Sequence, residues 1–369
     1  MSIKRHLKLV VSDCHLGTGA VLADGGINPL EDFRKDDKFV EFLEYYSTGD
    51  YSNASVELVI NGDFFDMLVA RTTTQFPYEI LESIAVYKMK RILKGHSKVI
   101  VALRKFIDSG HSVKMIWGNH DAGIWWPGVQ KEIHKTISPK LEIVLTDYTF
   151  DGVRIEHGHQ YEIMHHFDVD HMFLTAGTGT SRERTILNYP FGSFFVGGFL
   201  TPLKLRRSYV TQVVPFSKLI RWGLIFDFWF TVIHGIKAFW FFIKMRFIYH
   251  PYRFARVSKT LKIVGELFNR PKFTSIAPEI LRNYGAQILI MGHNHQPTHR
   301  HYPDGTQYVN TGTWTDVTSF DPGSLGRLSR PTYAIIEYPE GVAPGEGVLP
   351  KVSLQVWKGR HHEWEEFEP

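Results

Sequence analysis

The sequence contains a single cysteine, Cys14, among 369 residues. One cysteine excludes an internal disulfide, and a chain without disulfides is typical of a reducing compartment. The first residues lead directly into a short apolar run at 7–12, without the long apolar segment and small-residue cleavage site of a secretory signal. We therefore expect a cytoplasmic protein.

The sequence also lacks a long apolar run that is free of polar side chains. Its most apolar stretch, 226–249, is interrupted at roughly helical spacing by Asp227, Thr231, His234, Lys237 and Lys244. A helix that crosses a bilayer needs about 20 apolar residues with few charges. We therefore do not expect a membrane-spanning helix, and the stripe of polar residues favours a helix that lies on a surface.

Net charge is low, at +4, but its distribution is uneven. Residues 189–254 carry nine Lys or Arg against one acid and include 20 aromatic residues. A basic, aromatic helix is typical of binding to an anionic membrane surface. A helical lid that packs its aromatics on its own core or on a second subunit remains the alternative. Nucleic acid is not an expected partner, because the aromatics lie in runs and not between single basic residues.

Apolar runs and breaks predict an α/β fold. Two helical patterns lie at 35–46 and 77–108, the second broken near Gly95. The predicted strands lie at 7–12, 56–61, 113–117, 141–145, 153–156, 287–291, 307–310, 332–337 and 352–357. We expect a sandwich of two facing sheets covered by helices, formed by residues 1–159 and 273–358. Residues 160–272 interrupt it as an all-helical insertion, and 359–369 form a charged tail.

Five short motifs follow predicted strands, so that their side chains should lie at strand ends. They are Asp13-Cys14-His15, Gly62-Asp63, Gly118-Asn119-His120-Asp121, His157-Gly158-His159 and Gly292-His293-Asn294-His295. Each alone is weak, since the chain has 19 histidines and Gly-Asp pairs are usually turns. Their common placement at strand ends, however, favours a metal site. Imidazole and carboxylate ligands suit Mn, Fe, Zn or Co. The flanking histidines His165, His166, His299 and His301 are assigned no metal role.

In order and spacing, the motifs resemble those of the calcineurin-like metallophosphoesterase superfamily over residues 13–295. The resemblance implies a four-layer αββα sandwich and two divalent ions, with Mn²⁺ the first choice. It implies that one ion is held by Asp13, His15, Asp63 and His295. It implies that the other is held by Asp63, Asn119, His157 and His293, with Asp63 as the bridge. Two such ions activate a shared water and clamp phosphoryl oxygens.

His120 is assigned to the phosphoryl oxygen or the leaving group, as a donor or general acid. Asp121 is expected to orient the His120 imidazole, and a helix N-cap is the alternative role for Asp121. A non-catalytic scaffold with the same fold is another hypothesis, but all seven predicted ligands and His120 are present.

Within the superfamily the chain is similar to the UDP-2,3-diacylglucosamine hydrolases of lipid A biosynthesis, which carry a helical lid where residues 160–272 lie here. Members of that group often have Arg in place of His120, and their insertions are generally shorter. We expect a peripheral enzyme on the inner face of the membrane that hydrolyses a phosphorylated, lipid-linked substrate. Arg182, Arg184, Arg206 and Arg207 are candidates for binding that substrate. A phosphatase or phosphodiesterase for soluble phosphoesters, nucleotides or phosphoproteins is the rival. The sequence does not determine the oligomeric state.

Overall fold

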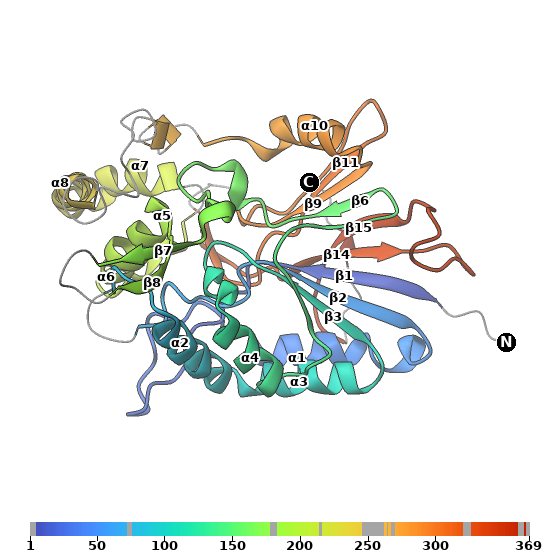
Figure 1. The fold of residues 1–369 in the computed structure, drawn as a ribbon. Coiled ribbons are helices and arrows are strands. Elements are labelled where there is room, and N and C mark those ends of the chain that lie inside the picture. The colour runs from blue at the N-terminus through green and yellow to red at the C-terminus, as the bar shows by residue number, and fades with distance from the viewer. Residues whose placement is uncertain are drawn as a thin grey trace.

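Two large sheets lie face to face in the computed structural model, with helices on their outer faces (Figure 1). The structure describes residues 5–71, 76–177, 183–213, 216–245, 262–263, 265–266, 270–319, 326–360 and 365–366. The fold is the four-layer αββα sandwich that the resemblance implies, and this prediction is confirmed.

The first sheet has seven strands in the order β16-β15-β14-β1-β2-β3-β4. They are β1 (His6–Val11), β2 (Ser55–Asn61), β3 (Ser112–Ile116), β4 (Glu142–Val144), β14 (Thr332–Glu337), β15 (Lys351–Val356) and β16 (Glu365–Glu366). Strands β1 to β4 run parallel, whereas β14 pairs antiparallel with β1. The parallel strands bring their carboxyl ends to one edge of the sheet.

The second sheet has five strands in the order β10-β11-β9-β6-β5. They are β5 (Tyr148–Phe150), β6 (Val153–Ile155), β9 (Ile288–Met291), β10 (Thr298–His301) and β11 (Gln307–Asn310). Strand β9 lies parallel to both β6 and β11. Aliphatic side chains from the two sheets form one buried cluster, in which Val59 and Ile116 of the first sheet join Ile155 and Ile290 of the second.

Four helices cover the outer face of the first sheet (Figure 1). They are α1 (Asp36–Tyr45), α2 (Glu82–Gly95), α3 (Ser97–Asp108) and α4 (Pro127–Thr136). The second sheet is covered by α10 (Phe273–Tyr284), whose Ala277 and Leu281 are buried with Leu289 and Tyr308. Helix α10 ends at Tyr284 and is followed by Gly285, which has a φ of 64° and supplies the left-handed C-cap conformation that glycine adopts without strain.

The segment between β6 and α10 lies beside the sandwich (Figure 1). Its elements are β7 (Phe173–Ala176), β8 (Arg184–Leu187), α5 (Phe191–Phe194), the π-helix η5 (Phe195–Leu200), α6 (Thr201–Lys204), α7 (Phe216–Phe226) and α8 (Phe228–Lys244). The expectation of an all-helical segment is wrong in one part, because β7 and β8 form an antiparallel hairpin. Strands of four residues are too short for a clear alternation in the sequence.

The remaining elements are short. Strands β12 (Val317–Ser319) and β13 (Gly326–Leu328) form a separate pair. The 3-10 turns are η1 (Gly49–Tyr51), η2 (Ala122–Trp125), η3 (His159–Tyr161), η4 (Val169–His171) and η6 (Ser208–Thr211). Within the charged tail, β16 adds an edge strand to β15. Across the described part of the chain, no helix combines the length and the apolar character needed to cross a membrane.

Candidate metal centre

The predicted ligands lie just beyond the carboxyl ends of five strands. Asp13 follows β1, Asp63 follows β2 and Asn119 follows β3. On the second sheet, His157 follows β6 and His293 follows β9. Because β1, β2 and β3 are mutually parallel and β6 is parallel to β9, these ends meet at one edge of the sandwich.

Several of these residues adopt a backbone conformation that side chains normally avoid. Positive φ values between 50° and 71° occur at Asp13, His15, Asp63, His293 and His295. In the described part of the chain, Asp151 is the one other non-glycine residue with a positive φ. Such strain costs roughly 1–3 kcal/mol per residue and gathers at functional sites. The occurrence of this backbone strain at five predicted ligands indicates a functional site.

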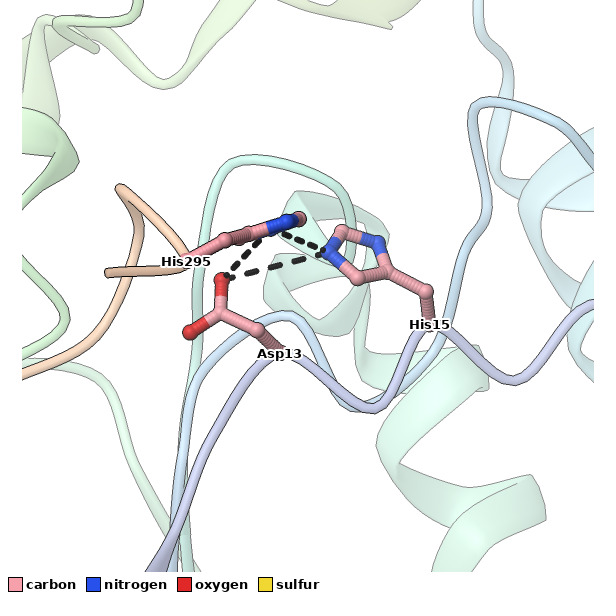
Figure 2. Close-up of side chains that lie close together, drawn as sticks. All are labelled: Asp13, His15 and His295. Carbon is pink, nitrogen blue, oxygen red and sulfur yellow. Dashed lines mark hydrogen bonds and ion pairs between the residues drawn. The ribbon is translucent and has the colours of Figure 1, made fainter. Parts of the chain in front are cut away.

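The first ligand group consists of Asp13, His15 and His295, whose polar atoms face one another (Figure 2). His15 Nε2 lies 3.0 Å from His295 Nε2. Asp13 Oδ1 lies 3.2 Å from His295 Nε2 and 3.9 Å from His15 Nε2. Asp63 Oδ2 is 4.0 Å from His15 Nε2, which places a fourth donor beside the group. Two imidazoles and two carboxylates that converge in this way could hold a divalent ion.

The second ligand group consists of Asp63, His157 and His293. Asp63 Oδ2 lies 3.3 Å from His157 Nε2. Asn119 follows Gly118, where an added Cβ would lie 2.2 Å from Asp63 Oδ1, and it is 2% exposed. Its Oδ1, like His157 Nε2, has no hydrogen-bond partner among the described residues. Buried polar atoms without partners are costly, so an ion that these atoms could bind fits the geometry. Asp63 belongs to this group, and its Oδ2 also lies 4.0 Å from His15 Nε2 of the first group.

Outer contacts orient the histidine ligands. His157 Nδ1 lies 2.8 Å from the carbonyl oxygen of Asn61, so that its Nε2 faces Asp63. His15 Nδ1 lies 3.4 Å from Asp66 Oδ2, which leaves Nε2 for the ligand group. Contacts of this kind fix the ring orientation and tautomer of metal-binding histidines.

His120 contacts Asp66 and not Asp121. Its Nδ1 lies 3.1 Å from Asp66 Oδ1, and its backbone N–H donates to Asp63 Oδ1 at 2.8 Å. Asp121 instead accepts hydrogen bonds from the backbone N–H groups of Gly118 and Phe64, at 2.5 and 3.0 Å. No hydrogen bond or ion pair joins Asp121 to His120 among the described contacts, and Asp121 makes no side-chain cap on η2. Asp121 thus stabilises the loop after β3, which carries Asn119, and the loop after β2, which carries Asp63.

A nitrogen of His120 also lies close to the metal ligands. His120, His15 and Asp63 each offer a ligand atom within 4.8 Å of the others. The assignment of His120 to the phosphoryl oxygen or the leaving group rested on the expectation that the adjacent side chains of Asn119 and His120 diverge. The proximity of His120 to Asp63 limits that argument. His120 also lines the pocket described below, so it lies between the ligands and the space for a substrate.

Burial and charge shift the pKa values of the site strongly. Burial alone would lower the pKa of His157, but Asp63 and Asp13 raise it to about 10. Burial likewise opposes the charged form of His120, whereas Asp66 and Asp63 raise its pKa to about 9. Burial and the charge of Asp63 raise the pKa of Asp121 to about 7. The carboxylates thus favour the cationic form of His157 and His120, whereas burial lowers the pKa of the predicted ligand His295.

A pocket of about 600 Å³ opens over the ligands. It joins His15, a predicted metal ligand, and His120 to an apolar wall from the inserted segment. That wall is formed by Val196, Leu200, Val210 and Val213. The basic residues on its rim are Arg270 and Lys272.

None of the four candidate arginines lines this pocket in the part of the chain that the structure describes. Arg184 is exposed on β8 and lies 2.6 Å from Glu79. Arg207 is exposed and pairs with Asp227 at 2.9 Å, and Arg206 is also exposed. Arg182 lies outside the described residues. Arg270 and Lys272 were not identified from the sequence, because no motif contains them.

Comparison with known proteins does not assign a family. No family model matches the chain, and no curated protein matches it. Similar solved structures include a predicted phosphoesterase from Streptococcus pneumoniae, 10% identical over 99% of both chains with a TM-score of 0.28. Vacuolar Protein Sorting 29 from Cryptosporidium parvum is 13% identical over 99% of this chain and 100% of its own, also with a TM-score of 0.28. The Zn²⁺ complex of wild-type Vps29 from Entamoeba histolytica is 10% identical over 98% of both chains, with a TM-score of 0.27.

Proposed function

We propose that this protein is a dinuclear metal-dependent hydrolase that cleaves a phosphoanhydride or phosphoester of a lipid-linked substrate at the membrane surface. The observation that carries the proposal is the convergence of Asp13, His15 and His295 beside Asp63 and His157. Several of these residues have strained backbone, and the buried Nε2 atom of His157 lacks a hydrogen-bond partner among the described residues. The leading candidate substrate is UDP-2,3-diacylglucosamine, which would yield UMP and a lipid 1-phosphate.

The proposed chemistry divides between the ions and the chain. Two bound divalent ions, with Mn²⁺ as the first choice, would lower the pKa of a shared water and polarise the phosphoryl group. His120 would donate a proton or hydrogen bond to the phosphoryl oxygen or the leaving oxygen, while Asp66 at its Nδ1 holds the ring. The leaving oxygen would take the His120 proton as the bridging P–O bond breaks and water adds to phosphorus, and the proton lost by the water would restore the protonated His120.

The composition of the pocket supports a substrate with both anionic and apolar parts. Arg270 and Lys272 offer positive charge for a second phosphate, and both lie on the same pocket as the ligands. The wall of Val196, Leu200, Val210 and Val213 offers apolar surface for acyl chains. A site for small soluble phosphoesters would not need such a wall.

Helices α7 and α8 support the membrane part of the proposal. They expose large apolar side chains, including Phe226 (75%), Trp229 (73%) and Trp240 (63%). Arg221 and Lys237 are exposed on the same helices. Aromatic side chains in the acyl boundary with basic residues at anionic headgroups are the expected arrangement of an interfacial helix. A cytoplasmic protein held peripherally on the inner face of the membrane is the corresponding location.

The substrate is tested by comparing hydrolysis of UDP-2,3-diacylglucosamine in detergent micelles with that of p-nitrophenyl phosphate, both with added Mn²⁺. We expect UMP release to exceed turnover of the soluble ester and to be abolished by Asp63→Ala. The matched control is Asp50→Ala, which removes an exposed carboxylate on η1. Turnover of only p-nitrophenyl phosphate would support hydrolase activity but refute the proposal of a lipid-linked substrate. No metal-dependent turnover of either compound would favour a scaffold.

Membrane contact is tested by flotation with phosphatidylglycerol vesicles and with phosphatidylcholine vesicles. We expect the protein to float with the anionic vesicles and the Phe226→Ser/Trp229→Ser variant to remain in solution. Tyr87→Ser is the control, because Tyr87 is also an exposed aromatic residue (50%) but lies on α2. Equal flotation of wild type and the double variant would show that these aromatics do not contact the membrane.

A further inference from the structure

We propose a third cation site, formed by Glu162, His165 and His293, next to the two predicted ones. Its ligand would be a divalent cation of the Zn²⁺ type, which two imidazoles and one carboxylate suit. The inference rests on the proposed dinuclear centre only in that it shares His293. From the sequence, His165 was assigned no metal role and Glu162 was not singled out, since neither is part of a recognised motif.

The distances match those of a small tetrahedral ion. Glu162 Oε2 lies 3.2 Å from His293 Nε2 and 3.7 Å from His165 Nε2. One ligand atom from each residue lies within 4.8 Å of the other two. Zinc bonds of about 2.0–2.2 Å place neighbouring tetrahedral ligands on the order of 3.4 Å apart. The three atoms therefore need little movement to enclose a cation.

Besides the two imidazoles, the positive charge of Arg270 acts on the Glu162 carboxylate at the centre of this group. The side chain of Glu162 is 3% exposed, and its Oε2 makes no hydrogen bond within the described part of the chain. The side chains of His165 and His293 are 9% and 6% exposed. Burial of a carboxylate is costly unless the group is paired or binds a metal. A cation between Glu162 and the two imidazoles would compensate for that cost.

His293 can serve two ions because its two ring nitrogens face different surroundings. Its Nε2 lies next to Glu162, whereas its Nδ1 is buried and has no hydrogen-bond partner among the described residues. The His293 ring also lies 5.3 Å from the His157 ring, centroid to centroid. We assign Nδ1 to the ion of Asp63 and His157, and Nε2 to the third cation. His293 would then bridge the two ions as an imidazolate, and its remaining ring N–H proton would be released to solvent when the third cation binds.

The turn that carries Glu162 and His165 is held in place by other parts of the chain. Glu266 accepts hydrogen bonds from the backbone N–H groups of Ile163 and Met164, at 2.9 and 2.7 Å. On the other side, a Cβ at Gly192 would lie 2.6 Å from His165 Nδ1, so the ring fits closely against this glycine. This contact leaves His165 Nε2 directed to Glu162. The site is thus preorganised by residues that are not ligands.

The cation would have an open coordination position. Three protein ligands leave one position of a tetrahedral ion for water or another oxygen. Glu162 and His293 line the same pocket as Arg270 and Lys272. An anionic oxygen in this pocket could therefore complete the coordination.

The rival explanation is that Glu162 only orients His293 as a hydrogen-bonding carboxylate, while His165 only packs. Metal stoichiometry distinguishes the two. We would dialyse the full-length protein against buffered Zn²⁺ and measure bound zinc per chain by mass spectrometry. We expect three zinc ions in the wild type and two in His165→Gln. His166→Gln is the control for zinc on exposed histidines, because His166 is adjacent but exposed, and it should retain three.

Glu162→Gln provides a second measurement. Loss of one ion in both Glu162→Gln and His165→Gln, with thermal unfolding still cooperative, would support the cation site. Two ions in the wild type, with His165→Gln unchanged, would overturn it even if Glu162→Gln weakens zinc binding. A failure of the proposed dinuclear centre gives a different result from a failure of the third site. If the dinuclear centre does not exist, Asp63→Ala would bind as much zinc as the wild type.

Discussion

The buried His96 side chain is predicted to stabilise the loop that follows His15 through its ion pairs, and this stabilisation can be tested. It lies at the break between α2 and α3 and is 1% exposed. Its Nδ1 lies 2.9 Å from Asp36 Oδ1, and its Nε2 lies 3.4 Å from Glu31 Oε2. Glu31 also accepts hydrogen bonds from the backbone N–H groups of Gly17 and Gly19, at 2.9 and 2.7 Å. His96 therefore connects two helices to the loop that follows His15.

The size and sign of the effect follow from the pKa. Burial alone would lower the pKa of His96, but Asp36 and Glu31 raise it from 6.5 to about 9. A folded-state pKa above the unfolded value stabilises the protein fully below about pH 6.5, and this stabilisation is lost as the pH rises through about 9. At 1.36 kcal/mol per pH unit, the pH-dependent contribution is about 3 kcal/mol.

The measurement is the free energy of unfolding by urea, for wild type and His96→Gln, from pH 6 to pH 10 in metal-free buffer. We expect the variant to be less stable than wild type at pH 6, with the gap narrowing by about 3 kcal/mol by pH 10. The control is His134→Gln, because His134 Nε2 contacts only the carbonyl oxygen of Leu141, at 3.0 Å, among its described hydrogen bonds. A gap between wild type and His96→Gln that does not change with pH would refute the reasoning.

Three further predictions concern the candidate site. Asp66→Asn should lower kcat by about 10–100-fold in a steady-state assay, because Asp66 contacts both His15 and His120; an unchanged kcat would remove its positioning role. Gly62→Ala should weaken metal binding by about 10–100-fold in a titration, since a Cβ there would lie 2.4 Å from His157 Nδ1. Gly49→Ala, which also has a positive φ but no atom near its Cβ, should bind metal normally. Mn²⁺ at 100 times its Kd should raise the free energy of unfolding by about 2.7 kcal/mol in wild type and by much less in Asp63→Ala, as measured by urea unfolding; equal stabilisation would contradict the ligand role of Asp63.

Local patterns predicted the main strands well because these strands are buried on both faces. The apolar run at 7–12 became β1 (His6–Val11), and the run at 56–61 became β2 (Ser55–Asn61). The break near Gly95 likewise separates α2 from α3. The hairpin of β7 and β8 could not be predicted, because each strand has four residues and depends on its partner for hydrogen bonds.

The sequence by itself determined which residues follow each strand, and therefore which side chains parallel strands bring to one edge. This is why Asp13 and Asp63, which follow the parallel strands β1 and β2, could be expected at one edge. The family resemblance implied that His157, which follows β6 of the second sheet, lies beside Asp63. Tertiary structure alone decided which carboxylates approach the histidines from outside the motifs. Asp66 reaches His15 and His120, and Glu162 reaches His293, through the packing of loops that no periodic pattern describes. Strand ends are set by local hydrophobicity, whereas these contacts depend on the position of whole segments in space.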